Sequence, residues 1–270
     1  MDIHIFVATH KKFSLLGDPE IYIPMQGGAA LYPEQRFGYM LDCTGDNISM
    51  KKENYNELTS LYWAWKNDFS DIIGLCHYRR YLTKNEGDFS SDYIYGRNDI
   101  ESVLTNYSVI LPYPHRHKGT TNRYWLNHLI RKENVEKLSF IIQNKYPDYF
   151  EDFNTIMNRD YACYCNILIS HKHIIDEYCN WLFPILSQLE DMVDTSDFST
   201  KEQRYLGYVA EYLLNVYFHH RKVKKGIKYV PMLLYIDNTE FRFKKIKKIL
   251  GKTPLFELLK HRSFYFRHTL

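Results

Sequence analysis

A histidine and two arginines directly follow an apolar run, and they are the residues of this chain best suited to phosphate chemistry. The run IIGLC at 72–76 continues into His77, Tyr78, Arg79 and Arg80. The run predicts a buried strand, and open α/β sheets bind ligands at the carboxyl ends of their strands. Guanidinium groups form charge-assisted, paired hydrogen bonds with phosphates. We therefore expect a diphosphate at this strand end.

The spacing of these four residues limits how many of them can act together. In an extended segment alternate side chains face opposite sides, so at most two of the four share the crevice unless the chain turns. One arginine is expected to be functional. The other is expected to pair with a carboxylate, either Asp42 or Asp71.

A polar turn upstream offers a second set of candidates. Asp46, Asn47 and Ser49 lie in the sequence GDNIS, and adjacent amide and carboxylate groups suit a uracil edge or ribose hydroxyls. The alternative is a turn capped by Asn or Asp with no further role. Asn54 and Glu57 have the spacing of a capping box, which would make Glu57 structural.

Two carboxylates are candidates for the general base that deprotonates an acceptor hydroxyl. Glu211 follows Arg204 by two turns of a predicted helix, so both can face the same side. Asp160 precedes Tyr161 and a predicted strand at 166–169. A structural role is the alternative for each.

Several enzyme classes lack their signatures in this chain. No GxGxxG, Walker A, GxSxG or HExxH pattern is present. The Asp-x-Asp that holds Mn or Mg in many enzymes with nucleotide-sugar donors is also missing. Two guanidinium groups can neutralise a diphosphate leaving group without a metal. We expect no cofactor, and leave open a divalent metal such as Mn or Mg.

Apolar runs and helical stripes alternate along the chain and predict the scaffold. This alternation favours an α/β fold with a mostly parallel central sheet flanked by helices. Residues 17–38 carry little periodicity and predict a loop. The predicted strands are 3–8, 72–76, 108–111 and 166–169, and the predicted helices cover 58–65, 100–104, 124–146, 174–189 and 206–217.

Length and composition predict one large domain, or a domain with an appendage, in an intracellular location. The chain has 270 residues, 45% of them hydrophobic, which is ample for a core. Its five cysteines are odd in number and form no CxxC pair, which favours a reducing compartment. The N-terminal segment lacks the pattern of a signal peptide, and no apolar stretch approaches a membrane span.

Charge is distributed very unevenly along the chain. Residues 221–270 hold 14 Lys and Arg against 3 Asp and Glu, whereas residues 1–220 carry a net charge of −8. Residues 241–267 form a basic amphipathic segment that is expected to lie on an anionic membrane surface; a solvated helix packed on the domain is the alternative. We expect no nucleic-acid partner, because the acidic body would repel phosphate.

Six segments together resemble a bacterial glycosyltransferase domain family, long catalogued as a domain of unknown function and found in capsule, exopolysaccharide and O-antigen clusters. The resemblance covers residues 1–235, and the string NIS…ELT…YWxWKN…HYRR is its most specific part. The segments are VATHKK (7–12), YIPMQGGAAL (22–31), DCTGDNISMKKENYNELTSLYWAWKN (42–67), IIGLCHYRRYL (72–82), YCNILIS (164–170) and RYLGYVAEYLLNVY (204–217).

The resemblance implies a GT-A-like domain over 1–235, followed by the basic extension 236–270. It also implies transfer of a hexosyl unit, galactofuranosyl or galactosyl among the options, from a UDP-sugar to a lipid-linked oligosaccharide acceptor. Such an enzyme would be cytoplasmic and peripheral at the inner membrane face. The alternative is a non-catalytic nucleotide- or glycan-binding subunit of a polysaccharide assembly complex.

The resemblance further assigns roles to particular residues. Glu211 matches a glutamate of the family's late helix, although Tyr212 stands where an arginine is expected, so a salt bridge there is in doubt. The donor-binding residues that it implies are Thr9, His10 and Lys11 at the nucleotide, Asp46, Asn47 and Ser49 in the same pocket, and His77, Tyr78, Arg79 and Arg80 at the diphosphate and sugar.

Overall fold

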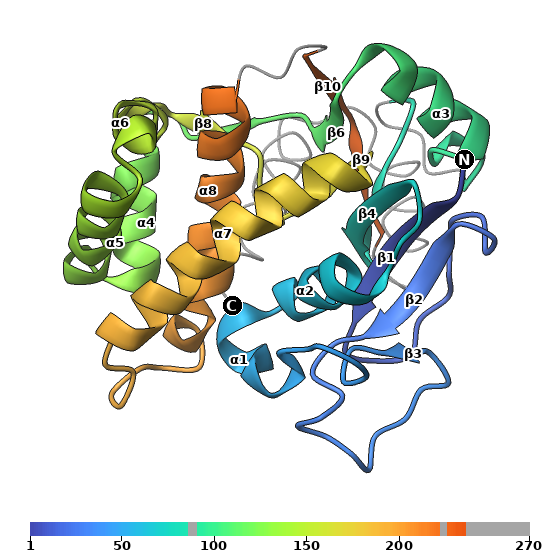
Figure 1. The fold of residues 1–270 in the computed structure, drawn as a ribbon, viewed down its shortest axis with the longest axis horizontal. Helices are drawn as coiled ribbons and strands as arrows, with labels where there is room; N and C mark the ends of the chain where they lie inside the picture. The colour runs from blue at the N-terminus through green and yellow to red at the C-terminus, as the bar shows by residue number, and fades with distance from the viewer. Residues whose placement is uncertain (86–90, 222–225, 236–270) are drawn as a thin grey trace, which may run out of the picture. The chain divides into compact units, whose positions relative to one another are not determined.

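A twisted, mostly parallel β-sheet forms the centre of the computed structural model, which describes residues 1–85, 91–221 and 226–235 (Figure 1). The order along the sheet is β10-β6-β9-β4-β1-β2-β3, with β5 paired to β4 and to β11. A separate ribbon pairs β7 with β8. The strands are β1 (Ile3–Thr9), β2 (Tyr22–Gln26), β3 (Met40–Leu41), β4 (Ile72–His77), β5 (Arg80–Leu82), β6 (Val109–Pro112), β7 (His115–Arg116), β8 (Tyr161–Ala162), β9 (Leu168–His171), β10 (Ile227–Val230) and β11 (Met232–Leu234).

The directions of the strands place several strand ends at one edge. β1 runs parallel to β2 and β4, and β10 runs parallel to β6. β9 is antiparallel to both β4 and β6, so β6 points the same way as β4. The prediction of an α/β fold with a mostly parallel sheet is confirmed. The carboxyl ends of β1, β2, β4, β6 and β10 therefore share one edge, where a ligand crevice is expected.

Helices cover both faces of this sheet. Side chains alternate along each strand, so Phe6 and Leu75 join one core, whereas Val7 and Cys76 join the other. α2, α7 and α8 pack in the first core and α3 in the second. The helices are α1 (Lys52–Tyr55), α2 (Leu58–Asn67), α3 (Arg97–Asn106), α4 (Asn122–Ile130), α5 (Lys132–Lys145), α6 (Phe150–Asn158), α7 (Lys172–Met192) and α8 (Tyr205–Arg221), with short 3-10 turns η1 (Ser49–Lys51), η2 (Ser91–Tyr93), η3 (Pro147–Tyr149) and η4 (Glu202–Arg204).

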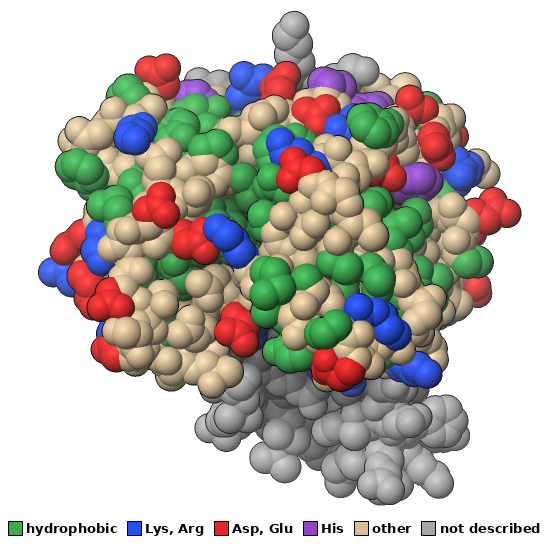
Figure 2. All heavy atoms as spheres, turned by 60° about the horizontal axis from the view of Figure 1, so that its bottom comes forward, with side chains coloured by type: hydrophobic (Ala, Val, Ile, Leu, Met, Phe, Trp, Pro, Cys, Tyr) green, Lys and Arg blue, Asp and Glu red, His purple; other side chains and the backbone are tan. Residues whose placement is uncertain are grey.

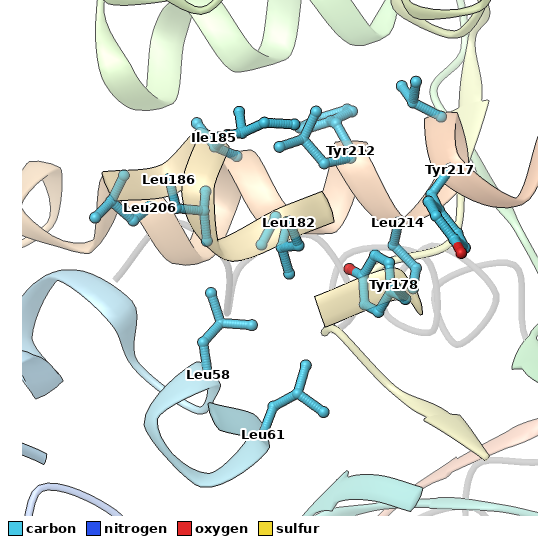
Figure 3. Close-up of a cluster of buried hydrophobic side chains, with 14 of the residues drawn as sticks. Leu58, Leu61, Tyr178, Leu182, Ile185, Leu186, Leu206, Tyr212, Leu214 and Tyr217 are labelled. Carbon is cyan, nitrogen blue, oxygen red and sulfur yellow. The ribbon is translucent and has the colours of Figure 1, made fainter. Parts of the chain in front are cut away.

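The larger core is a layer of leucine and tyrosine side chains (Figure 3). Leu58 and Leu61 of α2 face α7, and α7 also packs along α8. Tyr178, Leu182 and Leu206 in this layer are almost completely buried. Burying each large apolar side chain contributes about 1.5–3 kcal/mol, so this layer fixes the position of α8 above the sheet.

Three local predictions from the sequence are wrong. The loop predicted for 17–38 contains β2, whose Pro24 lies where β2 is an edge strand, since β3 pairs only with Met25 and Gln26. The strand predicted at 166–169 starts later, at Leu168. Asn54 does not cap a helix, because α1 continues past it to Tyr55.

Two glycines permit close approaches that hold the site together. A Cβ atom at Gly74 in β4 would lie 2.9 Å from Ile169 Cγ1 and 3.2 Å from Ile5. A Cβ atom at Gly207 in α8 would lie 2.6 Å from Asn56 Nδ2. The first contact lets β4 sit between its neighbours, and the second brings the start of α8 against the α1–α2 junction.

Residues Met1–Leu233 form one compact unit. None of the helices in the described part of the chain is long and apolar enough to cross a membrane. The predicted extension 236–270, including the amphipathic stretch 241–267, lies outside the described residues.

Substitution of Gly74 should destabilise the fold measurably. Gly74→Ala is expected to lower the free energy of unfolding by about 1–3 kcal/mol, because the new methyl group overpacks the sheet. Urea unfolding followed by circular dichroism would measure this. Ile169→Ala removes the colliding atom, so the double variant should cost less than the sum of the two single variants. Strictly additive costs would show that the contact is not limiting.

Candidate functional site

The carboxyl edge of the sheet gathers positive side chains around one tyrosine ring. Tyr78 directly follows β4 and is buried. The Lys11 ammonium lies 5.3 Å and the Arg79 guanidinium 4.9 Å from the centre of the ring. The His10 ring packs edge-on against it, with centroids 5.5 Å apart. The structure thus brings together the two predicted donor segments, residues 9–11 at the end of β1 and residues 77–80 at the end of β4.

Thr9 shapes the turn that leaves β1. Its hydroxyl donates a hydrogen bond to the Lys11 carbonyl at 2.7 Å and accepts one from the Lys11 N–H at 3.2 Å. The side chain is buried, so Thr9 positions Lys11 and does not present its own hydroxyl to the edge.

His10 responds to the positive potential of this edge. Its pKa is lowered by partial burial, and further by the charges of Lys52, Arg79, Lys11 and Arg204. Cations that lower the pKa of a nearby imidazole also favour a bound anion. The residues that act on His10 therefore outline a cationic cluster.

A tight turn brings His77 and Arg80 into contact. β4 and β5 are antiparallel with His77 opposite Arg80, and Arg80 Nη1 lies 3.2 Å from His77 Nδ1. A guanidinium can only donate, so His77 Nδ1 must accept and the imidazole hydrogen lies on Nε2. Burial lowers the pKa of His77 to about 4, while Glu57 opposes this shift. His77 is therefore neutral near pH 7.

Glu57 belongs to this cluster and does not complete a capping box. Its Oε1 accepts a 2.7 Å hydrogen bond from Asn166 Nδ2 and lies 3.8 Å from His77 Nε2. Burial raises the pKa of Glu57, but His77, the Asn166 hydrogen bond and the charge of Lys52 outweigh it, so the pKa lies below its usual value. Glu57 is therefore an ionised carboxylate of the site. The spacing in the sequence had predicted only the partner of Asn54 in a capping box.

Glu211 is the second buried carboxyl group of the cluster. It projects from α8, is 7% exposed, and accepts a 3.0 Å hydrogen bond from the Cys165 N–H. Cys165 (φ 73°) and Asn166 (φ 51°) both have positive φ, so the backbone turns sharply where it donates to Glu211. Burial, reinforced by the charge of Glu57, raises the pKa of Glu211 to about 8.

The environments of these two carboxyl groups push their pKa values apart. Glu57 is ionised near neutral pH, whereas Glu211 holds a proton that it can exchange near pH 8. A pair with separated pKa values is a common arrangement of acid and base groups in enzymes. The arrangement suits proton transfer at this edge of the sheet.

Lys52 is a site residue that sequence reasoning missed. Its side chain crosses the Gly27–Gly28 backbone so closely that a Cβ atom at Gly28 would lie 2.5 Å from Lys52 Cγ. Its ammonium makes no hydrogen bond or ion pair with any residue that the structure describes. Burial lowers the pKa of Lys52, against the opposing charges of Glu57 and Asp42. The Gly27–Gly28 pair is a sequence signal for a close approach of another chain segment, but it does not identify the side chain that makes it.

Arg204 completes the cations of the cluster. Its Nε donates to Asn56 Oδ1 at 2.9 Å, and its guanidinium lies 5.5 Å from the Tyr208 ring centre. The charge of Arg204 lowers the pKa of both His10 and Glu211. The five cations are Lys11, Lys52, Arg79, Arg80 and Arg204.

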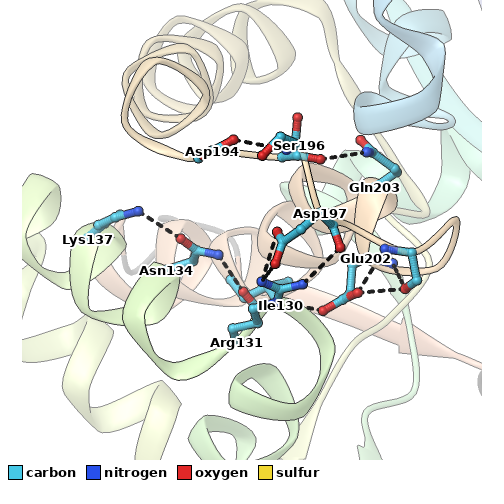
Figure 4. A network of polar contacts seen from close by, with 11 residues as sticks. Ile130, Arg131, Asn134, Lys137, Asp194, Ser196, Asp197, Glu202 and Gln203 are labelled. Carbon is cyan, nitrogen blue, oxygen red and sulfur yellow. Dashed lines mark hydrogen bonds and ion pairs between the residues drawn. The ribbon is translucent and has the colours of Figure 1, made fainter.

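A polar network anchors the segment that carries Arg204 (Figure 4). Arg131, in a left-handed conformation (φ 69°) between α4 and α5, donates to Glu202 at 2.7 Å and to the Asp197 carboxylate at 2.9 Å. Glu202 also accepts two hydrogen bonds from Ser199. Hydrogen bonds from Arg131 and Ser199 lower the pKa of Glu202 to about 2. The network holds η4, and with it Arg204, against the helical layer.

The polar turn GDNIS lies against α2. Asp46 accepts a hydrogen bond from the Tyr62 hydroxyl at 3.2 Å, and its N–H donates to Asn67. Asn47 Oδ1 accepts from the Ser49 N–H at 3.2 Å, which is an Asx turn. The contacts of Asp46 and Asn47 are with α2 and with their own turn, so the structure does not bring them against His77 or Arg80.

Ser49 and Asp42 act instead on the loop that follows β2. Asp42 accepts hydrogen bonds from Gly28 N–H at 2.7 Å, Ala29 N–H at 3.0 Å and the Ser49 hydroxyl at 2.6 Å. Ser49 in turn accepts from the Ala30 N–H. The prediction that one arginine pairs with Asp42 or Asp71 is wrong, because backbone N–H groups occupy Asp42 and the Asp71 carboxylate accepts from the Asp2 N–H at 2.8 Å. The network fixes the loop across which Lys52 lies.

Asp160 lies on the ribbon of β7 and β8, away from the contacts of the cluster. Its carboxylate pairs with Arg116 Nη1 at 2.9 Å, and its carbonyl accepts from the His117 N–H. No hydrogen bond or ion pair joins Asp160 to Glu57 or Glu211 in the described part of the chain. The structure thus brings together Glu211 and the strand-end residues, but not Asp160.

Several buried polar atoms at the strand ends have no hydrogen-bond partner among residues 1–85, 91–221 and 226–235. They include Gln26 Oε1, His77 Nε2, Arg79 Nε and Asn166 Oδ1. Each such atom costs about 1–3 kcal/mol, and a concentration of them is typical of a functional site. Within the same residues, no group of three or more His, Cys, Asp and Glu is placed to hold a metal ion.

The cluster stands out from the surface charge of the body. On the face drawn in Figure 2, Lys and Arg side chains are interspersed with Asp and Glu. Since residues 1–220 carry a net charge of −8, five cations at one edge are a local feature. Such a cluster favours a polyanionic ligand there.

The raised pKa of Glu211 should make the protein less stable as pH rises. The folded state keeps this proton up to about pH 8, whereas the unfolded chain releases it near the ordinary glutamate pKa. Stability should therefore fall between these pH values by about 1 kcal/mol per pH unit. Glu211→Gln removes the titration, so urea unfolding at pH 5, 6.5 and 8 should show a flatter profile.

Glu136→Gln, at an exposed carboxylate paired with Lys132, is the matched control and should follow the wild-type profile. Equal pH dependence in wild type and Glu211→Gln would contradict the assignment of the shifted proton.

Comparisons with known proteins agree with the fold. A solved structure of the bifunctional glycosyltransferase WbbM, in its apo form, is similar with a TM-score of 0.79 and 27% identity over 88% of this chain. This chain spans 46% of the length of that chain. No curated protein matches the sequence. The model of the family described as a domain of unknown function (DUF4422) matches residues 4–222, and the chain belongs to this family.

Proposed function

We propose that this chain is a glycosyltransferase that moves a hexosyl unit from a UDP-sugar to a glycan acceptor. The observation that carries the proposal is the cluster of five cations and two buried carboxyl groups at the carboxyl edge of the sheet. The likeness to a bifunctional glycosyltransferase supports it. The WbbM chain is about twice as long, so we do not assign both of its activities to this chain.

The cations would hold the donor through its diphosphate. Arg79, Arg80 and Lys11 follow β4 and β1, while Lys52 and Arg204 approach from the helical layer. They neutralise the UDP leaving group as the bond from the anomeric carbon to the diphosphate oxygen breaks. Thr9 and His10 would lie near the nucleotide. Ser49 would shape this side of the site through the loop after β2, whereas Asp46 and Asn47 would support it from the turn packed on α2.

Glu211 would act as the general base. As the new bond forms between the anomeric carbon and the acceptor oxygen, the hydroxyl proton would pass to the Glu211 carboxylate. A base with a pKa of about 8 is strong enough for this task and partly ionised near neutral pH. Asp160 is the rival base, and its ion pair with Arg116 argues against it.

The proposed setting is the synthesis of a surface polysaccharide such as capsule, exopolysaccharide or O-antigen. The hexosyl unit would be galactofuranosyl or galactosyl, and the acceptor a lipid-linked oligosaccharide. The enzyme would be cytoplasmic, with the basic residues 241–267 at the inner membrane face. The charge asymmetry of the sequence supports this placement.

A thermal-shift screen would test donor binding. UDP or a UDP-sugar should raise the melting temperature, because a ligand that binds only the folded state stabilises it. The shift should survive EDTA if the cations alone hold the diphosphate. A shift that needs Mn would mean that a metal joins the site, and no shift with any nucleotide would contradict the proposal.

Arg80→Ala and Lys52→Met should each raise the Kd for UDP about 10- to 100-fold, since each removes a charge-assisted contact. Arg97→Ala is the control. Arg97 donates to the Met1 carbonyl at the amino edge of the sheet, so it should leave the Kd unchanged.

Glu211→Gln and Asp160→Asn should separate the two candidate bases. Glu211→Gln is expected to lower kcat by about 100- to 10,000-fold while UDP still binds. Asp160→Asn should leave kcat within a few-fold of wild type. Transfer measured by release of UDP would decide between them, and the opposite pattern would assign the base to Asp160. Binding of UDP without any transfer would favour the non-catalytic subunit.

A further inference from the structure

A pocket lies between α6, α8 and the β6–β10 side of the sheet, and the proposed donor site does not use it. Its volume is about 140 Å³. Cavities of about 150 Å³ hold one six-membered ring. The residues that matter for its chemistry are Arg159, Tyr161, Asn215, Phe218, His219 and Tyr229.

The polar side of this pocket is a half-buried guanidinium. Arg159 Nη2 lies 3.4 Å from His219 Nε2, and Arg159 Cζ lies 5.5 Å from the Tyr161 ring centre. Within the described ranges, no carboxylate forms an ion pair with Arg159. A guanidinium has five N–H donors, so most of them are available to hydroxyl or other oxygen acceptors.

The walls of the pocket are aromatic. Tyr161, Phe218 and Tyr229 contribute to its lining. Burial raises the pKa of Tyr229 to about 12, so its phenol stays neutral and can both donate and accept. Flat apolar faces combined with a few fixed polar groups match a sugar ring, which has apolar C–H faces and hydroxyls at its rim. A bare anion would find only one arginine and mostly apolar walls.

The position of the pocket relates it to Glu211. Asn215 lies one helical turn after Glu211 on α8, and it accepts from the Cys163 N–H at 2.8 Å. Glu211 accepts from the Cys165 N–H on the same backbone segment. The pocket and the proposed base therefore adjoin neighbouring parts of one segment and one helix.

We infer that this pocket binds one sugar ring of the acceptor glycan, remote from the ring that receives the hexosyl unit. The inference rests on the proposed transferase function and adds an acceptor subsite to it. Binding energy from a remote ring can be used to orient the reacting hydroxyl. Arg159 would donate to ring hydroxyls, and Tyr229 would stack on the ring.

Saturation-transfer NMR of the full chain, saturated with UDP, would test this. The probes are methyl glycosides of galactose, glucose and mannose and their β-linked disaccharides. At least one probe should bind while UDP is bound, and Arg159→Ala and Tyr229→Ala should each weaken it about tenfold or more. Phe140→Ala, which removes an exposed aromatic ring of α5, should not change it. Melting temperatures would confirm that each variant is folded.

The contrary outcomes are distinct. The inference would be overturned if no probe binds, or if adding UDP abolishes binding. It would also be overturned if Arg159→Ala and Tyr229→Ala bind the probe as tightly as the wild type. Displacement of the probe by inorganic phosphate would show that the pocket is an anion site and would also overturn it. If UDP fails to bind but a glycoside binds in an Arg159-dependent way, the transferase proposal fails and the pocket is a sugar site of another kind.

Discussion

Burial of two carboxyl groups in one cluster is the constraint on which the rest of this site depends. An ionised carboxylate loses several kcal/mol of hydration when it is buried, so Glu57 needs the Asn166 hydrogen bond and the neighbouring Lys52 charge to stay ionised. Glu211 is buried beside the negative charge of Glu57, so it keeps its proton near neutral pH. The cations at the strand ends therefore surround one ionised carboxylate and one carboxyl group that can exchange its proton near pH 8.

Unusual backbone at three places makes this centre. Asn56, Cys165 and Asn166 all have positive φ, a conformation that costs a side-chain-bearing residue about 1–2 kcal/mol. The first directly precedes Glu57, and the other two lie where the Cys165 N–H donates to Glu211 and the Asn166 side chain donates to Glu57. Packing of α8 against Asn56 through Gly207 holds these turns in place. Strain of this kind commonly collects at functional sites, where the surrounding structure compensates for it.

Particular elements show how far local sequence could predict the fold. β1 and β4 are apolar runs buried on both faces, so composition alone located them. β2 was missed because residues 17–38 carry little periodicity, and the sheet tolerates Pro24 only because β2 is an edge there. The Asn54–Glu57 spacing suggested a cap, yet Glu57 forms a hydrogen bond with Asn166, 109 residues away. Such a partner has no local signal.

The sequence by itself determined the strand ends and the types of side chain they carry, because apolar runs must be buried and polar residues must follow them. It thus located His77, Arg79 and Arg80 at the end of a buried strand and Glu211 on a helix. Only the tertiary structure decided that Lys52, Arg204 and Glu57 join them and that Asp160 does not. The reason is that these neighbours depend on strand order, on the packing of α8 and on the turn at Cys165, which are set by contacts between distant segments.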